Sequence, residues 1–104
     1  MYGDVRTLKR ELAKEKEILA CAERFGLVGD PTRMKICWLL CHHRELSVGD
    51  IAAVLGVSVS VVSHSLRKLR EHQLVRARRQ QRQVFYRLAD PAFRQVLRLG
   101  VATR

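Results

Sequence analysis

Residues 47–72 read SVGDIAAVLGVSVSVVSHSLRKLREH, and this stretch decides the fold. Ser47 and Asp50 have the Ser-x-x-Asp spacing of a capping box, which predicts that a short helix begins there. Gly56 ends the following apolar run, where a helix terminus favours a residue that tolerates positive φ. Ser58 has the residue type of the N-cap of a second helix. Two short helices joined by a glycine-containing turn predict a helix-turn-helix over residues 47–72.

The second helix of this pair has two faces of different chemistry. Val62, Leu66 and Leu69 recur at helical spacing, and we expect them to pack on the core. The second helix of a helix-turn-helix typically enters the DNA major groove, so its opposite face would meet bases and phosphates. That face carries hydroxyl, imidazole and guanidinium donors, on Ser60, Ser63, His64, Arg67 and Arg70.

The chain after this motif predicts a basic β-hairpin and a last helix. Residues 74–88 contain two segments rich in strand-forming side chains around a polar tip, residues 79–83. We expect this hairpin to lie along the phosphate backbone as a wing. Asp90-Pro91 then has the form of a helix start, and residues 90–101 are amphipathic. The predicted fold is mainly α, a winged helix-turn-helix with a two-stranded β-hairpin wing.

The chain before the motif predicts two further helices. Asp30-Pro31 marks the start of an apolar helix that runs to about His42 and should be buried. Residues 1–28 contain a helix that we expect to be continuous from about Val5 to Leu27. Because this helix is longer than a small core needs, we interpret its apolar stripe as a dimerisation surface, with packing inside the protomer as the alternative. The stripe consists of Val5, Leu8, Leu12, Leu19 and Ala22.

The distribution of charge favours a polyanionic partner. The 104 residues include 20 Lys+Arg and 10 Asp+Glu, a formal net charge of +10. Residues 1–57 hold nine Lys/Arg and eight Asp/Glu, whereas residues 58–104 hold eleven Lys/Arg and two Asp/Glu. A basic half suits nucleic acid, although a solvated surface with an accidental bias is the simpler interpretation of composition alone.

Length and composition also exclude several classes. We expect residues 1–104 to form a single domain, too small for separate cofactor and substrate domains. The chain has no long uncharged apolar segment for a membrane helix and no signal-peptide pattern at its start. It has no glycine-rich phosphate loop and no arrangement of nucleophile and base, so an enzyme is not expected. These features predict a cytoplasmic, nucleoid-associated protein with no membrane partner and no required cofactor.

Four blocks of the sequence together resemble the ArsR/SmtB family of metal-responsive repressors. They are DPTR at 30–33, ELSVGDIA at 45–52, LGVSVSVVSHSL at 55–66 and VFYRL at 84–88. The resemblance covers about residues 20 to 98. It implies a homodimer built from the first and last helices that binds double-stranded, near-palindromic operator DNA. It also implies repression that ends when a metal, metalloid or thiol oxidant binds.

The resemblance implies which residues contact DNA. On the helix and the wing these are Ser58, Ser60, Ser63, His64, Arg67, Arg78, Arg79 and Arg82. Val59 and Val61 replace hydrogen-bonding residues of the family, so we expect a different operator preference. Gln73 and Gln81 replace glycines before the wing and at its tip, where a helix end and a hairpin turn favour positive φ.

The sensing residues are less constrained by the resemblance. The two usual metal-binding motifs of the family are absent, and the candidate ligands that remain are Cys21, Cys37 and Cys41. Cys37 and Cys41 are four residues apart on one helix, so their thiolates could bind a soft ion such as As(III), Cd(II) or Hg(II), with Cys21 as a third ligand. Core packing and a redox or sulfur-species switch are the alternatives for these cysteines.

The sequence therefore supports three hypotheses about function. The first is a dimeric repressor released from its operator by a thiophilic metal or metalloid. The second keeps the same DNA-binding repressor but assigns the cysteines to a redox or sulfur-species switch. The third, from another class, is a basic RNA-binding or interaction module without operator specificity.

Overall fold

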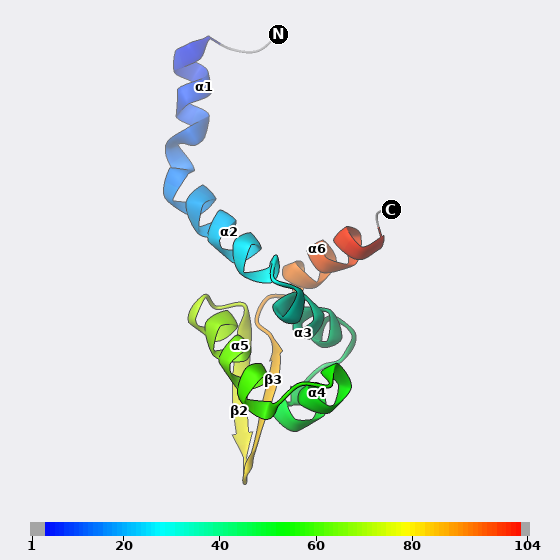
Figure 1. The fold of residues 1–104 in the computed structure, drawn as a ribbon. Coiled ribbons are helices and arrows are strands. Elements are labelled where there is room, and N and C mark those ends of the chain that lie inside the picture. The colour runs from blue at the N-terminus through cyan, green and yellow to red at the C-terminus, as the bar shows by residue number, and fades with distance from the viewer. Residues whose placement is uncertain (1–3, 103–104) are drawn as a thin grey trace.

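The computed structural model describes residues 4–102. Its helical elements are α1 (Val5–Glu11), the 3-10 helix η1 (Leu12–Lys14), α2 (Glu15–Val28), α3 (Pro31–His42), α4 (Val48–Leu55), α5 (Val59–Glu71) and α6 (Pro91–Ala102). Its strands are β1 (Leu46–Ser47), β2 (Val75–Gln80) and β3 (Gln83–Leu88), which form one antiparallel sheet in the order β1-β3-β2. The molecule is elongated, with extents of 57 × 30 × 21 Å. The arm formed by α1 and α2 leaves the body at one end, and the β2–β3 hairpin projects at the other (Figure 1).

The helix-turn-helix predicted for residues 47–72 is confirmed. The Ser47 hydroxyl accepts a hydrogen bond from the Asp50 N–H at 3.1 Å, and the Ser58 hydroxyl accepts one from the Val61 N–H at 3.1 Å. Gly56 adopts a left-handed conformation with φ 69° and ψ 32°, which closes the end of α4. The direction of the chain then changes by 116° between α4 and α5. Each capping residue therefore acts where the sequence predicted it.

The wing is a tighter hairpin than the sequence indicated. Cα pairing extends along the hairpin to Gln80 and Gln83, which leaves only Gln81 and Arg82 in the turn. The predicted five-residue tip is wrong because Gln81 adopts a φ of 56°, which permits a two-residue connection. The sheet also gains the two-residue strand β1, which pairs with β3 and which is too short to produce a sequence pattern.

The N-terminal helix is interrupted, so the prediction of one continuous helix is wrong. Leu12, at the end of α1, donates its N–H to the carbonyls of Arg10 and Lys9. These acceptors are nearer in sequence than in an α-helix, so the helical turn becomes tighter and leads into η1. Two like-charge pairs at i, i+4 span this break, Arg10 with Lys14 and Glu11 with Glu15, and such pairs destabilise a helix. No residue of α1 is buried, so tertiary packing does not offset that repulsion.

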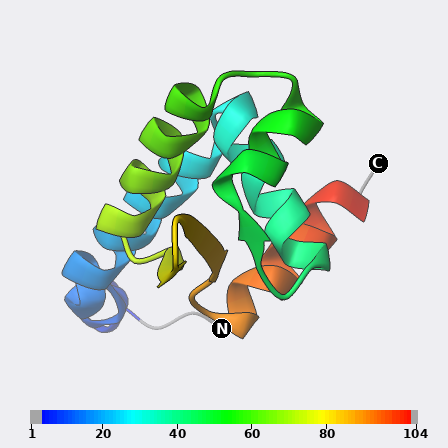
Figure 2. The same cartoon turned by 90° about the horizontal axis from the view of Figure 1, so that it is seen from below.

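The core lies around α3. Ile36 and Leu40 of α3 are completely buried, as are Leu66 and Leu69 on the inner face of α5. Asp30 caps α3 by accepting a hydrogen bond from the Arg33 N–H at 3.0 Å. This packing fixes which face of α5 points outward. Figure 2 views the molecule from the wing end and shows α5 beside the hairpin.

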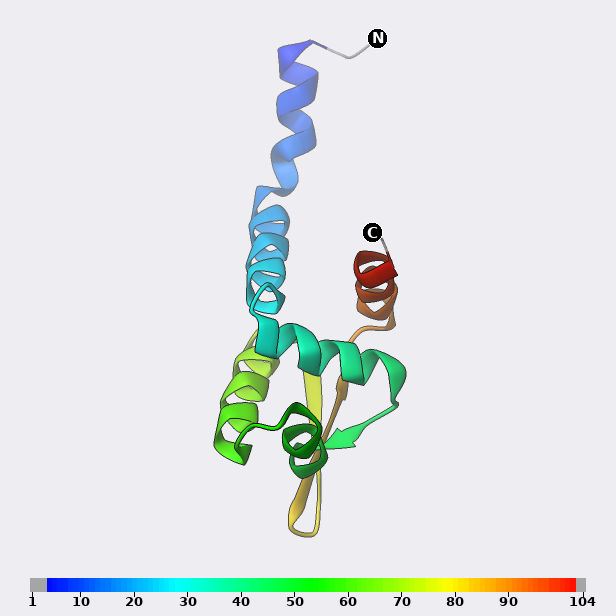
Figure 3. The ribbon, with the colours of Figure 1, turned by 45° about the vertical axis from the view of Figure 1, so that its right-hand side comes forward.

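The predicted apolar stripe does not pack within the protomer. All five of its residues, Val5, Leu8, Leu12, Leu19 and Ala22, are exposed. Phe25, on the same arm, is 52% exposed and Val96 on α6 is 41% exposed. Figure 3 shows α2 and α6 rising from the same end of the body, away from the wing. The protomer thus carries an uncovered apolar surface on the two helices that the sequence assigned to dimerisation.

Within residues 4–102, no single helix combines the length and the apolar character needed to cross a membrane. The bent pair α4 and α5 passes that test jointly, on length and composition alone.

Candidate nucleic-acid interface and sensor cysteines

The outward face of α5 presents most of its predicted donors to solvent. Ser60, His64 and Arg67 are exposed, and Ser63 is half-buried. Ser58 is also exposed, but its hydroxyl oxygen accepts the capping hydrogen bond, so it keeps its O–H to donate to a phosphate or base. The hydrophobic face of the helix is buried in the core, which holds these donors in a fixed register.

A basic concavity lies between α5 and the wing. Its volume is about 470 Å³, and its lining includes Ser63 and Arg67 from α5 and Arg79 from β2. Arg70, one turn beyond Arg67, also lines it. No acidic residue contributes to the lining, so three guanidinium groups converge on a space that suits an anion. The structure thus brings together predicted contact residues that are separated by up to 16 positions in the sequence.

The other two predicted wing residues have different surroundings. Arg82 lies in the turn and is exposed. Arg78 is bound within the protein: its Nε and Nη2 groups donate to the two carboxylate oxygens of Glu45, and its Nη1 donates to the Gln80 side-chain oxygen at 2.7 Å. Its guanidinium carbon also lies 4.9 Å from the centre of the Phe85 ring. Arg78 therefore has protein partners where the resemblance implied a DNA partner.

Two of the three predicted sensor cysteines belong to the core. Cys37 is completely buried and Cys41 is 2% exposed. The Cys41 thiol lies 3.5 Å from the Arg94 carbonyl oxygen, to which it donates. Burial raises the pKa of the Cys37 thiol to about 12, and the neighbouring Arg33 offsets only part of this effect. Because metal binding and nucleophilic attack both need a thiolate, this environment opposes both.

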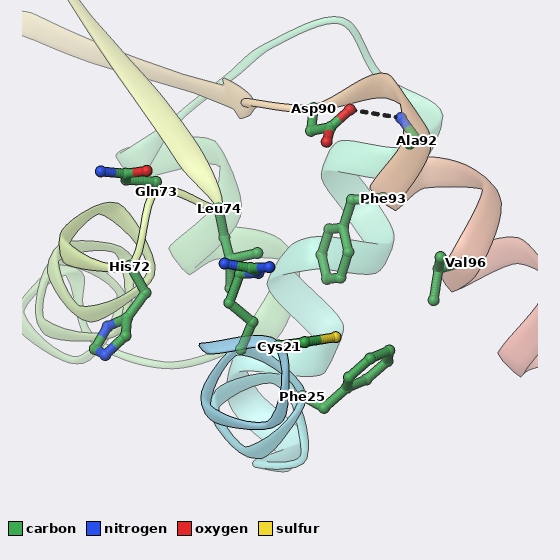
Figure 4. Close-up of a pocket in the computed structure, with 10 residues that line it drawn as sticks. Cys21, Phe25, His72, Gln73, Leu74, Asp90, Ala92, Phe93 and Val96 are labelled. Atoms are coloured by element: carbon green, nitrogen blue, oxygen red, sulfur yellow. Dashed lines mark hydrogen bonds between the residues drawn. The ribbon is translucent and has the colours of Figure 1, made fainter. Parts of the chain in front are cut away.

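Cys21 lies in a separate place, at the edge of a cavity of about 380 Å³ between α2, the end of α5 and the start of α6. Figure 4 shows its sulfur atom among Phe25, Phe93 and Val96, with His72 on the α5 side. In the part of the chain that the structure describes, no three His, Cys, Asp or Glu side chains form a group that could hold a metal ion. The predicted three-cysteine site is therefore not assembled within this protomer.

Comparison with known proteins agrees with the helix-turn-helix and wing described above. Residues 30–77 match a family model described as bacterial regulatory protein, arsR family. A cadmium resistance transcriptional regulatory protein CadC homolog from Staphylococcus aureus is 32% identical over 93 residues, covering 89% of this chain and 76% of that protein. The chain belongs to the arsR family of bacterial regulatory proteins.

Further arsR-family similarity comes from a second relative and a solved structure. A transcriptional repressor SmtB homolog from Synechocystis sp. is 42% identical over 86 residues, covering 83% of this chain but only 64% of its own length. The homodimeric winged helix-turn-helix DNA-binding domain of Mb0332 from Mycobacterium bovis superposes with a TM-score of 0.78 at 26% identity, covering 86% of this chain and 82% of that one. These matches confirm the winged helix fold, and the expectation that the chain is not an enzyme agrees with a family of regulatory proteins.

Several basic residues near the wing were not among the contact residues predicted for this arsR-family chain. Arg44 and Arg87 line a second concavity of about 570 Å³ together with Glu45 and Arg78. Arg76 is the Cα partner of Arg87 across the hairpin, so two like charges face each other. Like charges at directly opposite positions destabilise a hairpin, and a polyanion would relieve that repulsion. For Arg76 the available signal was its place two residues before Arg78, because a period of two puts both side chains on one face of the strand.

Proposed function

We propose that this arsR-family protein is a dimeric transcriptional repressor that binds double-stranded operator DNA. The observation that carries the proposal is the basic concavity between α5 and the wing, where Ser63, Arg67, Arg70 and Arg79 converge beside the exposed face of a helix-turn-helix. The proposed DNA contacts are Ser58, Ser60, Ser63, His64 and Arg67 from the helix, with Arg79 and Arg82 from the wing. The guanidinium groups serve the phosphates, and the hydroxyl and imidazole groups serve base edges or phosphates.

The proposal includes a homodimer, which would bind an operator with matching two-fold symmetry. The uncovered apolar stripe on α1, η1 and α2 supplies the surface, and a homodimeric DNA-binding domain is among the structural relatives. Two recognition helices in a dimer would sit about 34 Å apart and contact half-sites one DNA turn apart. The operator would accordingly be near-palindromic.

The test of DNA binding is fluorescence anisotropy with the DNA upstream of the protein's own gene. We expect binding that survives excess competitor DNA of unrelated sequence and that weakens as salt rises. Equal affinity for every duplex, or a preference for RNA of the same length, would instead support the basic RNA-binding or interaction module.

We further propose that a thiol-reactive effector releases the DNA. The favoured class is a thiophilic metal or metalloid ion such as As(III) or Cd(II), supported by the cysteines and by the cadmium-resistance relative. An oxidant or sulfur species is the alternative. Cys21, Cys37 and Cys41 do not form one metal site within a single protomer. We therefore propose that the effector binds first at Cys21, which is half-buried, whereas the other two cysteines are buried.

The effector proposal is tested by adding soft metal ions and mild oxidants separately to the protein–DNA complex. We expect one class to release the DNA, and we expect Cys21→Ser to reduce that release. Release that is unchanged in a Cys21→Ser/Cys37→Ser/Cys41→Ser protein would rule out cysteine sensing. Mass spectrometry of the oxidised protein separates the two classes, because a disulfide or persulfide on Cys21 changes its mass.

We expect the protein to act in the cytoplasm, at the nucleoid.

A further inference from the structure

Glu45 is the single acidic residue among those lining the second wing concavity, where it meets Arg44, Arg78 and Arg87. Its carboxylate accepts two hydrogen bonds from the Arg78 guanidinium, one through each oxygen. This bidentate geometry is the one with which guanidinium also binds a phosphate. A DNA phosphate that binds the same Nε–Nη2 edge of Arg78 must therefore displace Glu45.

Several contacts hold this ion pair in place. The Glu45 side chain is 26% exposed and the Arg78 side chain 49% exposed, so the carboxylate is the more enclosed partner. Glu45 directly precedes β1, and β1 pairs with β3, so the carboxylate is fixed relative to the hairpin. The Gln80 side-chain oxygen takes a third Arg78 donor, and Phe85, the Cα partner of Arg78, lies against the guanidinium.

The electrostatics of the pair agree with this geometry. The hydrogen bond from Arg78 lowers the pKa of Glu45, with smaller contributions from the charges of Arg44 and Arg87. The same hydrogen bond raises the pKa of Arg78. Both groups stay charged at neutral pH, so the positive charge of Arg78 is compensated in the free protein.

We propose that Glu45 competes with DNA phosphate for Arg78 and so weakens binding to DNA of any sequence. The inference rests on the proposed DNA-binding function. Phosphate contacts carry no direct sequence information, so withholding one of them lowers the affinity for operator and unrelated DNA alike and leaves the base contacts unchanged. Glu45 therefore sets how strongly the wing holds DNA, and the ratio of operator to unrelated affinity stays with the base contacts.

The test compares wild type with Glu45→Gln on an operator duplex and on an unrelated duplex of equal length, over a series of salt concentrations. We expect Glu45→Gln to bind both duplexes more tightly, by a similar factor. The slope of log affinity against log salt should steepen by about 0.9, the value for one added phosphate contact. The operator-to-unrelated affinity ratio should stay near the wild-type value, because a phosphate contact contributes similarly on both duplexes.

Two further variants separate this effect from a general gain of positive charge. Glu71→Gln removes the same charge from the end of α5 and should leave the salt slope at the wild-type value. Glu45→Gln/Arg78→Gln removes the freed guanidinium and should return the slope to the wild-type value. Thermal denaturation and circular dichroism check that each variant is folded.

Three results would overturn the inference. The first is a Glu45→Gln slope equal to that of wild type, and the second is an equal steepening in Glu71→Gln. The third is weaker operator binding by Glu45→Gln with a shallower slope, which would mean that the ion pair presents Arg78 to the DNA. Failure of the proposed function itself gives a different result, namely that wild type shows no salt-dependent binding to either duplex.

Discussion

Gln73 and Gln81 adopt left-handed backbone conformations, with φ of 62° and 56°. Gln73 ends α5 in a way that resembles a Schellman motif, since the Leu74 N–H donates to the Leu69 carbonyl at 2.9 Å. The sequence predicted a need for positive φ at both positions, and the structure confirms it. A side chain with a Cβ atom costs free energy in this conformation, whereas glycine does not.

We therefore predict that Gln73→Gly and Gln81→Gly each raise the free energy of unfolding by about 0.5–1 kcal/mol. The gain is the relief of backbone strain, less the extra entropy that glycine gives the unfolded chain. Urea denaturation measures it, with Gln80→Gly as the control, because Gln80 lies in β2 and glycine should destabilise it. If Gln73→Gly and Gln81→Gly both destabilise the protein as much as the control does, the role of backbone strain is contradicted.

The buried thiol of Cys37 gives a prediction about pH. The ordinary pKa of a cysteine thiol is 9.0, and burial raises that of Cys37 to about 12. The unfolded chain therefore loses this proton near pH 9 while the folded chain keeps it. The stabilising contribution of the buried neutral thiol is complete below pH 9 and is lost as the pH rises toward 12.

We predict that the free energy of unfolding of wild type, relative to Cys37→Val, is constant around neutral pH and falls above about pH 9. Valine has a similar volume and does not titrate, so the difference isolates the thiol from the other groups that ionise in this range. Urea denaturation at a series of pH values measures it. A difference that stays constant well above pH 9 would show that Cys37 ionises freely in the folded protein.

At the scale of elements, a substitution of Arg67 tests whether α5 and the wing bind a DNA phosphate together. We predict that Arg67→Ala weakens DNA binding nearly equally on operator and unrelated duplexes, and that it makes the salt slope shallower by about one. The reason is that Arg67 lines the basic concavity with Arg79, where a phosphate would lie. Arg98→Ala, on the exposed surface of α6, is the matched control and should leave the slope unchanged. A loss confined to the operator would make Arg67 a base contact.

Elements with local chemical signals could be predicted from the sequence. The caps Asp30, Ser47 and Ser58 and the turn residue Gly56 each act through neighbours within a few residues, so their residue types suffice. Strand β1 could not be predicted, because it exists only through pairing with β3, which lies much later in the chain. The break in the N-terminal helix depends on missing tertiary contacts, which apolar spacing does not reveal.

The candidate site was predictable to a similar extent. Helical periodicity identified the outward face of α5, because the inward residues share an apolar pattern. The Glu45–Arg78 pair was not predictable, since the two residues are 33 positions apart and meet only in the folded sheet. The burial of Cys37 and Cys41 was left open by their spacing, because an apolar helix such as α3 has few polar residues to mark its exposed side.

At the scale of the whole molecule, the uncovered arm predicts how the protein assembles. We expect Leu19→Glu to convert the proposed dimer to a monomer, because Leu19 is 58% exposed on the arm and a buried, unpaired carboxylate at an interface is unfavourable. The protomer itself should keep its fold, since this residue contributes nothing to the core. Sedimentation velocity measures the mass, and circular dichroism checks the fold. Lys16→Glu, a polar position on the same helix, is the control, and an equal loss of dimer there would indicate a general charge effect.

The arm has a consequence for proteolysis. Residues 5–14 contain Arg6, Lys9, Arg10 and Lys14, all exposed, on a segment with no buried residue. Trypsin should therefore cut the isolated protomer in this arm while the body stays intact, and assembly should shield the same bonds. Cleavage in the arm would then slow as protein concentration rises, because a larger fraction of the protein is assembled. The resistance of the protein to proteolysis would therefore depend on its concentration. A trypsin time course at several protein concentrations measures this relation directly.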